Sequence, residues 1–288
     1  MAKKVVGSMS DWSGLLKDLF RQFQDGSITL QHLCDFTEHR NPFPTAEVRE
    51  DIVVVQQPPP ESVQSVVKLT FNEACAKACG LLGMASEYAE FVKKFGNEQA
   101  PGYWTLPMVK AEECVKAAKA TGYKLTCNKV FAVLKAELRK LGKDAWSAYD
   151  DIDKAVADDL KKNIKRNQRD PNRDGSYLIS FKAAVEADEE NANQSADDRP
   201  WESHKDIVLL ERLFLELIYF LMTGENLDVK NWTLCAGSRF VGGDVPYVYF
   251  YSGFSWVYVY WCSSDDAHPG LRARSAFSLP TEASKAKP

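Results

Sequence analysis

The sequence predicts an α+β protein, in which a mostly helical N-terminal region precedes a smaller domain built on antiparallel strands. Three observations support this prediction. Apolar residues recur at helical spacing through much of the first half of the chain, whereas residues 245–262 alternate with a period of two. A polar, turn-forming stretch at 163–175 separates the two patterns and is typical of a domain boundary. The expected regions are a helical region at 1–165, a C-terminal domain at 166–280 and a disordered tail at 281–288.

Amphipathic patterns predict the helices of the first region, which are 11–24, 29–39, 71–95, 112–121, 126–142 and 150–166. Residues 52–69 instead hold two β-like apolar runs around QQPPPES, which suits a linker or a strand entrance. GYWTLPMV at 102–109 interrupts the helices, and Pro107 is expected to begin the next one. The first two helices form a helix-turn-helix outline without a basic reading face, so packing or protein contact is preferred to DNA binding.

In the second region, SYLISF (176–181) predicts a strand and EADEENANQSADDR (186–199) predicts an acidic loop. Residues 204–223 predict a helix that ends at Gly224 and is apolar on nearly every face, and is therefore buried. A fragment that starts near Asn167 is expected to hold the C-terminal sheet without the first region.

Residues 245–262, VPYVYFYSGFSWVYVYWC, predict a hairpin that turns near 252–255. One face of the hairpin is aliphatic and points to a core: Val248, Phe250, Val257, Val259 and Trp261. The opposite face is rich in tyrosine: Tyr247, Tyr249, Tyr251, Trp256, Tyr258, Tyr260 and Cys262. This second face is either buried, as in a sandwich interior, or a recognition surface, because Tyr supplies large rigid contact area with a polar tip. The absence of Lys, Glu, Gln and Met between Phe240 and Ala273 favours recognition.

The segment LCAGSRFVGGDVPYVYFYSG…VYVYW…GLRARSAFS resembles the variable region of target proteins of diversity-generating retroelements. This resemblance covers roughly residues 176–279, and the chain as a whole resembles bacterial proteins with the same helical first half. It implies a C-type-lectin-like domain whose surface residues are rewritten by adenine-directed mutagenic reverse transcription. The Gly-Phe-Arg strand that usually ends this fold is replaced here by LRARSAFS (271–278).

The resemblance implies a non-enzymatic protein that needs no cofactor and binds a protein or other macromolecular ligand. Mutation of AAC-type codons reaches Tyr, Phe, Ser, Asp, His, Cys and Val among others, but does not reach Lys, Glu, Gln, Met or Trp. The expected ligand-binding, variable residues are Phe240, Val241, Tyr247, Tyr249, Tyr251, Phe254, Ser255, Tyr258, Tyr260, Cys262, Ser263, Ser264, Asp266 and His268. Fixed scaffold roles are expected of Arg239, Trp261, Arg272 and Arg274, because arginines pin strand or loop ends through bidentate bonds.

Composition and the length of the apolar stretches indicate the class of protein and its location in the cell. The 288 residues are 45% hydrophobic, which supports a sizeable core. The net charge of −4 and the pI of about 5.7 argue against a general nucleic-acid or anionic-membrane binder. MAKKVVGSMSDW lacks the apolar run of a signal peptide. The longest apolar stretch, 207–222, falls short of the ~20 residues that span a bilayer. We expect a soluble, cytoplasmic protein.

Three alternatives compete with ligand binding of this kind. Nucleic acid could stack its bases on the four tyrosines Tyr247, Tyr249, Tyr258 and Tyr260, but the chain is acidic and the segment lacks Lys. Cys235 and Cys262 resemble the reactive cysteines of formylglycine-generating enzymes, which share the lectin-like fold, but the accompanying motif is missing. Cys75, Cys79, Cys114 and Cys127 could form a zinc site with a distant His, but such cysteines more often serve as small buried hydrophobes, and no metal is expected.

Overall fold

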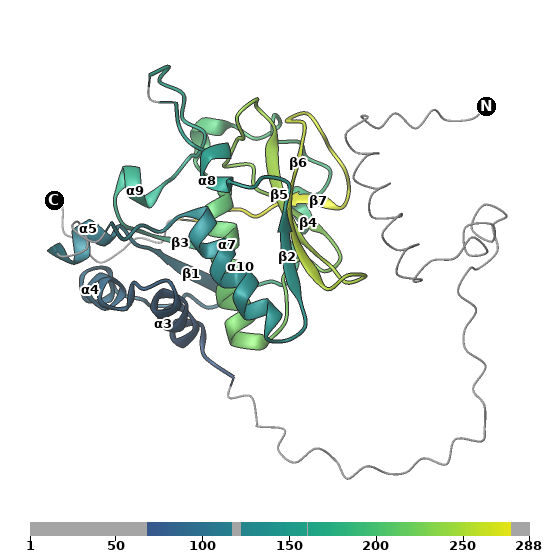
Figure 1. Cartoon of the computed structure of the whole chain (residues 1–288). Helices are drawn as coiled ribbons and strands as arrows, with labels where there is room; N and C mark the ends of the chain where they lie inside the picture. Colours follow the sequence, from purple (N-terminus) through teal and green to yellow (C-terminus); the bar gives the residue numbers. More distant parts are fainter. Residues whose placement is uncertain (1–67, 117–121, 160, 278–288) are drawn as a thin grey trace, which may run out of the picture. The chain divides into compact units, whose positions relative to one another are not determined.

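A five-stranded mixed sheet and a two-stranded sheet frame the part of the chain that the computed structural model describes, residues 68–116, 122–159 and 161–277 (Figure 1). The strands are β1 (Tyr103–Met108), β2 (Asp144–Ser147), β3 (Tyr177–Lys182), β4 (Trp232–Leu234), β5 (Val245–Tyr251), β6 (Trp256–Cys262) and β7 (Leu271–Ala273). The large sheet has the order β2-β6-β5-β4-β7, with β2–β6 and β4–β7 parallel and the other pairs antiparallel. The remaining strands, β1 and β3, pair antiparallel.

Seven α-helices accompany these strands in the described residues: α3 (Phe71–Leu81), α4 (Ala85–Phe95), α5 (Ala111–Cys114), α7 (Cys127–Arg139), α8 (Ile152–Ala155), α9 (Pro171–Asp174) and α10 (Leu209–Thr223). Short 3-10 turns occur at Glu189–Asn191 and Trp201–Ser203. The central helix α10 packs against α7, α3 and β5. Helices and strands together make this an α+β protein, as predicted.

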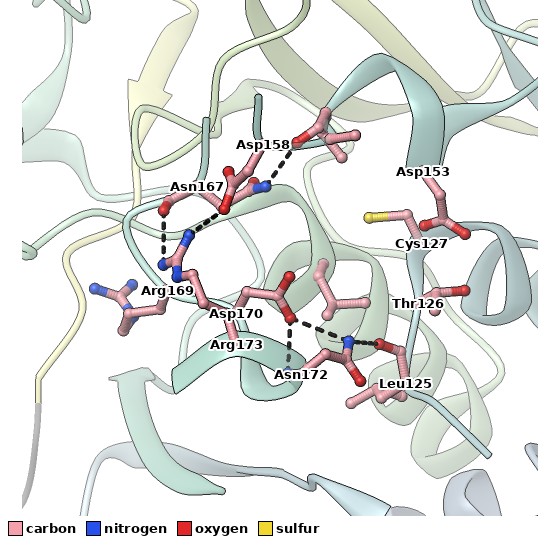
Figure 2. A pocket seen from close by; sticks show the side chains of 13 residues that line it. Leu125, Thr126, Cys127, Asp153, Asp158, Asn167, Arg169, Asp170, Asn172 and Arg173 are labelled. Atoms are coloured by element: carbon pink, nitrogen blue, oxygen red, sulfur yellow. Dashed lines mark hydrogen bonds and ion pairs between the residues drawn. The ribbon is translucent and has the colours of Figure 1, made fainter. Parts of the chain in front are cut away.

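The predicted boundary at 165/166 is wrong, because the described residues on either side of it belong to one compact unit. Strand β1 pairs with β3, and β2 pairs with β6, so both sheets join segments from either side of the boundary. The polar stretch itself is tied back to earlier residues (Figure 2). The Arg173 guanidinium donates to Asp158 at 2.7 Å, and the Asn172 amide donates to the Leu125 carbonyl at 2.9 Å. The polar side chains of this stretch therefore form hydrogen bonds within the fold. In a linker, the same groups would bond to water.

Several predicted elements of the first region also differ. The stretch 102–109 is not an interruption but contains β1, and Pro107 lies within that strand, in a two-stranded sheet where an edge position tolerates proline. Helix α8 covers only four residues of the predicted helix 150–166, and the chain then turns back in an Asp159–Ile164 bridge. Helix α5 ends at Cys114. The predicted helices 11–24 and 29–39, most of the 52–69 stretch and the tail 281–288 lie outside the described residues.

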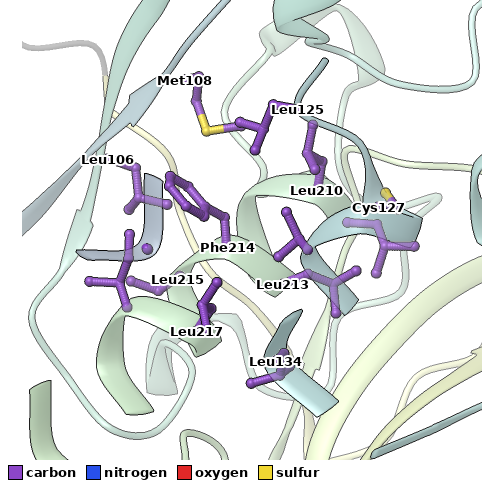
Figure 3. Packing of buried hydrophobic residues seen from close by; sticks show 14 of the residues in the cluster. Leu106, Met108, Leu125, Cys127, Leu134, Leu210, Leu213, Phe214, Leu215 and Leu217 are labelled. Carbon is purple, nitrogen blue, oxygen red and sulfur yellow. The ribbon is translucent and has the colours of Figure 1, made fainter. Parts of the chain in front are cut away.

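Helix α10 is the buried helix that the sequence predicts, although it begins at Leu209 rather than 204. Its apolar side chains pack against β1 and α7, as Leu213, Phe214 and Leu217 do in Figure 3. Two of the four free N–H groups at its start have side-chain partners: the Glu211 carboxylate accepts from the Val208 N–H, and the Ser238 hydroxyl accepts from the Leu209 N–H. Gly224 ends the helix with a φ of 75°.

A fully buried charge network joins α10 to the large sheet. The Arg212 guanidinium donates to Glu216 at 2.7 Å and to Asp228 at 2.7 Å, and all three side chains have no exposed surface. Arg274, which follows β7, donates to the second oxygen of Asp228 at 2.6 Å. Two positive and two negative groups therefore balance inside the core, which is the arrangement that buried charges require.

None of the helices that the structure describes has the length and apolar character needed to cross a membrane.

Candidate binding surface on the large sheet

The predicted hairpin is confirmed as the centre of the large sheet. Strands β5 and β6 pair with Val248 opposite Val259 and with Tyr249 opposite Tyr258, and the turn occupies residues 252–255. Because neighbouring residues of a strand point to opposite faces, the valines share one face and the tyrosines share the other. Val248 and Val259 are fully buried in the core that contains α10.

The opposite face of the sheet carries aromatic side chains from four adjacent strands. We call this surface the aromatic face and define it by Trp146, Trp232, Tyr247, Tyr249, Tyr258 and Tyr260. Trp146 of β2 lies 5.7 Å from Tyr258, and Tyr258 lies 5.4 Å from Tyr249, between ring centroids. Trp232 of β4 continues the row, 5.7 Å from both Tyr249 and Tyr247. These separations are those of favourable aromatic pairs, so the rings support one another in place.

The aromatic face is partly exposed to solvent. Trp146 is 39% exposed and Tyr260 is 38% exposed, while Tyr247, Tyr249 and Tyr258 are half-buried by their neighbours. The hairpin turn extends the surface through Trp256 and two more exposed rings, Tyr251 and Phe254, whose centroids lie 5.4 Å apart. Of the two interpretations left open by the sequence, burial on both sides does not apply to these residues.

Two predicted contact residues are buried, Cys262 where one end of the same face is closed and Phe240 in the main core. Cys262 and Val245 pack with Ala196, Leu234, Ala236, Leu271 and Ala273 in a second small hydrophobic cluster. Cys262 is therefore only 9% exposed, although its position in the strand places it on the tyrosine side. Phe240 is 1% exposed, with its ring 4.3 Å from Tyr149. Neither side chain is available to a partner in this structure.

Trp261 also departs from its predicted place in the core. It lies on the valine side of β6 but is 41% exposed and stacks on the neighbouring Tyr260, 5.9 Å away. Val257 and Val259 belong to the main core cluster, whereas Trp261 does not. The alternation of β6 predicts correctly which face of the sheet carries Trp261. The core, however, does not extend to this end of the strand.

The loops beside the sheet hold the other predicted contact residues. The His268 ring stacks on Trp232 at 5.4 Å and so adjoins the aromatic face. Ser263, Ser264 and Asp266 shape the loop after β6: the Ser263 N–H donates to Asp266, and the Ser264 hydroxyl donates to Asp197. Val241 is 58% exposed in the loop after Phe240, and Ser255 occupies a left-handed turn position with a φ of 56°. The structure therefore gathers His268, Phe254 and the tyrosines, and leaves Val241 in a separate loop.

The three arginines make hydrogen bonds of the predicted kind, but to different extents. Arg274 donates to Asp228, to the Thr233 hydroxyl and to the carbonyls of 184 and 185. Arg239 donates to the carbonyls of 236 and 238, with its guanidinium 5.0 Å from the Trp201 ring. Arg272 has one such contact, to the Pro269 carbonyl.

The aromatic face is uncharged and has acidic surroundings. Burial raises the pKa of Tyr247, Tyr249 and Tyr258, so their hydroxyls remain protonated at neutral pH. The stretch 240–271 contains no Lys or Arg but includes Asp244, Asp265 and Asp266. Nearby Asp197 is also exposed. The face can therefore stack, bury apolar area and exchange hydrogen bonds at the hydroxyl tips, whereas its border attracts positive rather than negative groups.

The cysteines of the described residues lie in environments that keep them protonated. Burial raises the pKa of Cys262 to about 12 and also raises the pKa of Cys235. Cys75 and Cys79 are buried on α3, and Cys114 is partly buried. Among the residues that the structure describes, no three side chains of His, Cys, Asp or Glu come together as a metal site.

Sequence reasoning missed Trp146 and Trp232, which border the tyrosines on both sides. Trp146 belongs to DAWS, a four-residue strand too short to be recognised by its alternation, and it joins the sheet by parallel pairing with β6. Trp232 begins WTL in β4, where Thr233 faces the core opposite Val248. The alternation within WTL was the available signal that Trp232 lies on the same face as the tyrosines.

Comparisons of the chain with protein-family models, with curated proteins and with solved structures gave no match.

Proposed function

We propose that this protein binds a protein partner through the aromatic face and catalyses no reaction there. The observation that supports this proposal is the contrast between the two faces of one hairpin. The valine face is buried against α10, whereas the tyrosine face leaves a continuous row of aromatic rings in contact with solvent. Monomeric proteins rarely expose contiguous apolar surface without a use for it, and Tyr and Trp are the residues that contribute most at protein interfaces.

Nucleic acid fits the surroundings of the face less well. Stacking platforms for single strands combine aromatic rings with a positively charged groove that follows the phosphates. Here the neighbouring charges include Asp244, Asp265 and Asp266, and the stretch 240–271 contains no Lys or Arg. A partner with basic groups at its rim would complement this border.

We also propose that the tyrosines of the face belong to a diversified surface on a C-type-lectin-like scaffold. Support comes from the resemblance of the segment and from how two kinds of residue are arranged. Tyr247, Tyr249, Tyr258 and Tyr260 are of a type that adenine-directed mutation produces, and they occupy the middle of the face. Trp146 and Trp232 are of a type that it cannot produce, and they border the tyrosines. A reverse-transcriptase gene and a near-copy of the 3′ end beside this gene are expected, and the absence of both would contradict diversification.

Binding can be tested by changing the open part of the face. Wild-type protein and the variant Tyr249→Ser/Tyr258→Ser/Tyr260→Ser would be used to capture partners from the producing cell. Tyr123→Ser serves as the control, because Tyr123 is 36% exposed but lies outside the aromatic face. Each captured protein would then be purified and titrated against all three forms. The triple variant should lose most of the affinity and the control should retain it, because truncated aromatic anchors each cost about 2 kcal/mol or more.

Equal affinity of a captured partner for wild type and the triple variant would contradict the proposal. Two further measurements address the rivals. A single-stranded oligonucleotide that binds wild type and not the triple variant would favour base stacking. Sedimentation of the protein alone would show whether the face pairs with a second copy, in which case the triple variant would sediment as a smaller species.

A further inference from the structure

The rings of the aromatic face have no cation of this chain over them in the part that the structure describes. Elsewhere in that part, a Lys or Arg side chain lies 5.0–5.5 Å from the centroids of five rings: Phe95, Tyr123, Trp201, Phe220 and Phe250. None of these rings belongs to the aromatic face. The flat side of a Tyr or Trp ring attracts a cation, and Arg is the commonest one. This kind of contact is therefore used within the fold but stays available on the aromatic face.

The tyrosine hydroxyls of the face are also without protein partners in the described part of the chain. The hydroxyls of Tyr247, Tyr249, Tyr258 and Tyr260 take part in no hydrogen bond there, whereas the Tyr177 hydroxyl donates to a carboxylate. No buried polar side-chain atom of the described residues lacks a partner, so the four hydroxyls can be reached from outside. A hydroxyl oxygen accepts hydrogen bonds, and a guanidinium only donates them.

A loop with two aspartates runs along the border of the face. It comprises residues 263–267, begins where β6 ends, and leads to His268, whose ring stacks on Trp232 at 5.4 Å. Both ends of the loop therefore adjoin the large sheet on the side of the tyrosines. Asp265 and Asp266 lie within this short connection, and both are exposed.

The charge of this loop acts on side chains of the face itself. Burial raises the pKa of Tyr247, and neighbouring groups that can carry negative charge, Asp266 among them, raise it further. Burial likewise raises the pKa of Cys262, and both Asp266 and Asp244 add to the effect, with Arg239 opposing them. Two carboxylates against one guanidinium leave this end of the face negative.

The carboxylates around the sheet differ in whether a cation of the chain pairs with them. Asp144, in the edge strand β2, forms salt bridges with Lys135 and Arg139 at 3.6 and 3.1 Å. Asp265 and Asp266 form none with the described residues, and their hydrogen-bond donors are neutral groups of their own loop. A second copy of the chain would bring the same negative border, so a positively charged partner complements the face better.

We propose that the partner of the aromatic face is a protein that presents arginine side chains to it. The guanidinium groups stack on the tyrosine rings and donate to the tyrosine hydroxyls and to the carboxylates of Asp265 and Asp266. Arginine is preferred to lysine, because a guanidinium is planar and weakly hydrated, stacks on aromatic rings and pairs with a carboxylate through two N–H groups. This inference rests on the proposed function, since it names the chemistry of the partner that binds there.

The test uses the full chain, labelled with nitrogen-15, and an acetylated and amidated Gly-Ser peptide that carries three arginines. Two matched peptides carry lysine or citrulline at the same positions, and citrulline keeps nearly the shape of arginine without its charge. The arginine peptide should bind saturably and shift the amide signals of residues 245–251, 256–262 and 263–268. The lysine peptide should bind about threefold more weakly or worse, and the citrulline peptide should not saturate.

Two variants and a control connect this binding to the face. Tyr249→Ser/Tyr258→Ser/Tyr260→Ser should abolish binding of the arginine peptide. Asp265→Asn/Asp266→Asn keeps the oxygen acceptors of the loop and should weaken binding by about threefold to tenfold, because exposed charge pairs contribute modestly. That loss should shrink in about 0.5 M salt, which screens exposed charges. The control is Glu112→Gln, which removes an exposed carboxylate from α5, away from the large sheet (Figure 1), and should change nothing.

The proposal would be overturned by an arginine peptide that does not saturate, or by lysine or citrulline peptides that bind as tightly as the arginine peptide. Shifts confined to residues outside the three ranges would also overturn it, and this readout needs no variant. Failure here is distinct from failure of the proposed function. A captured partner that loses affinity for the triple tyrosine variant but binds Asp265→Asn/Asp266→Asn as tightly as wild type would keep the binding surface and reject an arginine-bearing partner.

Discussion

Arg272 and Arg274 are two residues apart, yet their surroundings differ sharply. Arg274 is 1% exposed and donates to four acceptors, including the buried Asp228 carboxylate. Arg272 is partly exposed and donates to one carbonyl. Nothing in the local sequence LRARS distinguishes the two arginines. Their surroundings differ because of their positions in the fold.

Replacing Arg274 by Gln should lower the free energy of unfolding by about 3–5 kcal/mol, because it removes one partner from a buried ion network. The same replacement at Arg272 should cost less than about 1 kcal/mol, since a partly exposed side chain with one hydrogen bond contributes little. Urea unfolding of both variants beside wild type measures the difference. Similar losses in both variants would mean that the buried network does not determine stability here.

At the scale of elements, the β5–β6 hairpin divides its residues between two environments. Val248 and Val259 have no exposed surface, whereas Tyr251 and Tyr260 are 47% and 38% exposed. Tyr247 is intermediate, because it also packs against the second hydrophobic cluster. The hairpin therefore contributes stability through one face and leaves the other available.

Val248→Ala and Val259→Ala should each cost about 2–3 kcal/mol through lost burial and the cavity left behind. Tyr251→Ser and Tyr260→Ser should each stay within about 1 kcal/mol, because exposed substitutions perturb stability little. Trp261→Ser, which the strand pattern alone would group with the valines, should behave like the tyrosines. Thermal melts of the five variants test this order. A tyrosine variant that melts as low as the valine variants would show that the aromatic face is part of the core.

At the scale of the whole molecule, sheet pairing joins segments that are far apart in the chain. Residues 103–108 pair with 177–182, and residues 144–147 pair with 256–259. Helix α10 packs against α3 and α7, and both of these helices lie before residue 140. The described residues between 68 and 277 thus belong to one compact unit, which differs from the two-region organisation expected of the sequence.

A fragment of residues 167–288 should fail to unfold cooperatively, because it lacks β1, which pairs with β3, β2, which is one of the two partners of β6, and the helices that cover α10. A fragment of residues 65–288 should unfold in a single transition at the wild-type denaturant midpoint. Circular dichroism during urea titration compares the two fragments with the full chain. A cooperative transition in the shorter fragment would restore the boundary near 165.

The candidate site was predictable wherever local alternation decides which side chains share a face. The period of two in 245–262 placed four tyrosines opposite the valines, and the structure agrees. Predictions failed where burial depends on another segment. Cys262 follows the same alternation but is covered by the second cluster, which includes Ala196 and Leu271, and Phe240 packs against Tyr149. Trp146 was missed because its strand enters the sheet from a region that reads as helical.

By itself, the sequence determined the α+β class, the hairpin with its two unlike faces, the strand at 176–181 and the buried helix that ends at Gly224. Each of these depends on spacing between near neighbours, which backbone geometry converts directly into a face or a cap. Only the tertiary structure decided that β2 lies beside β6 and that Arg274 is buried whereas Arg272 is partly exposed. These features depend on contacts between residues distant in the chain, and no local pattern specifies which distant segments meet.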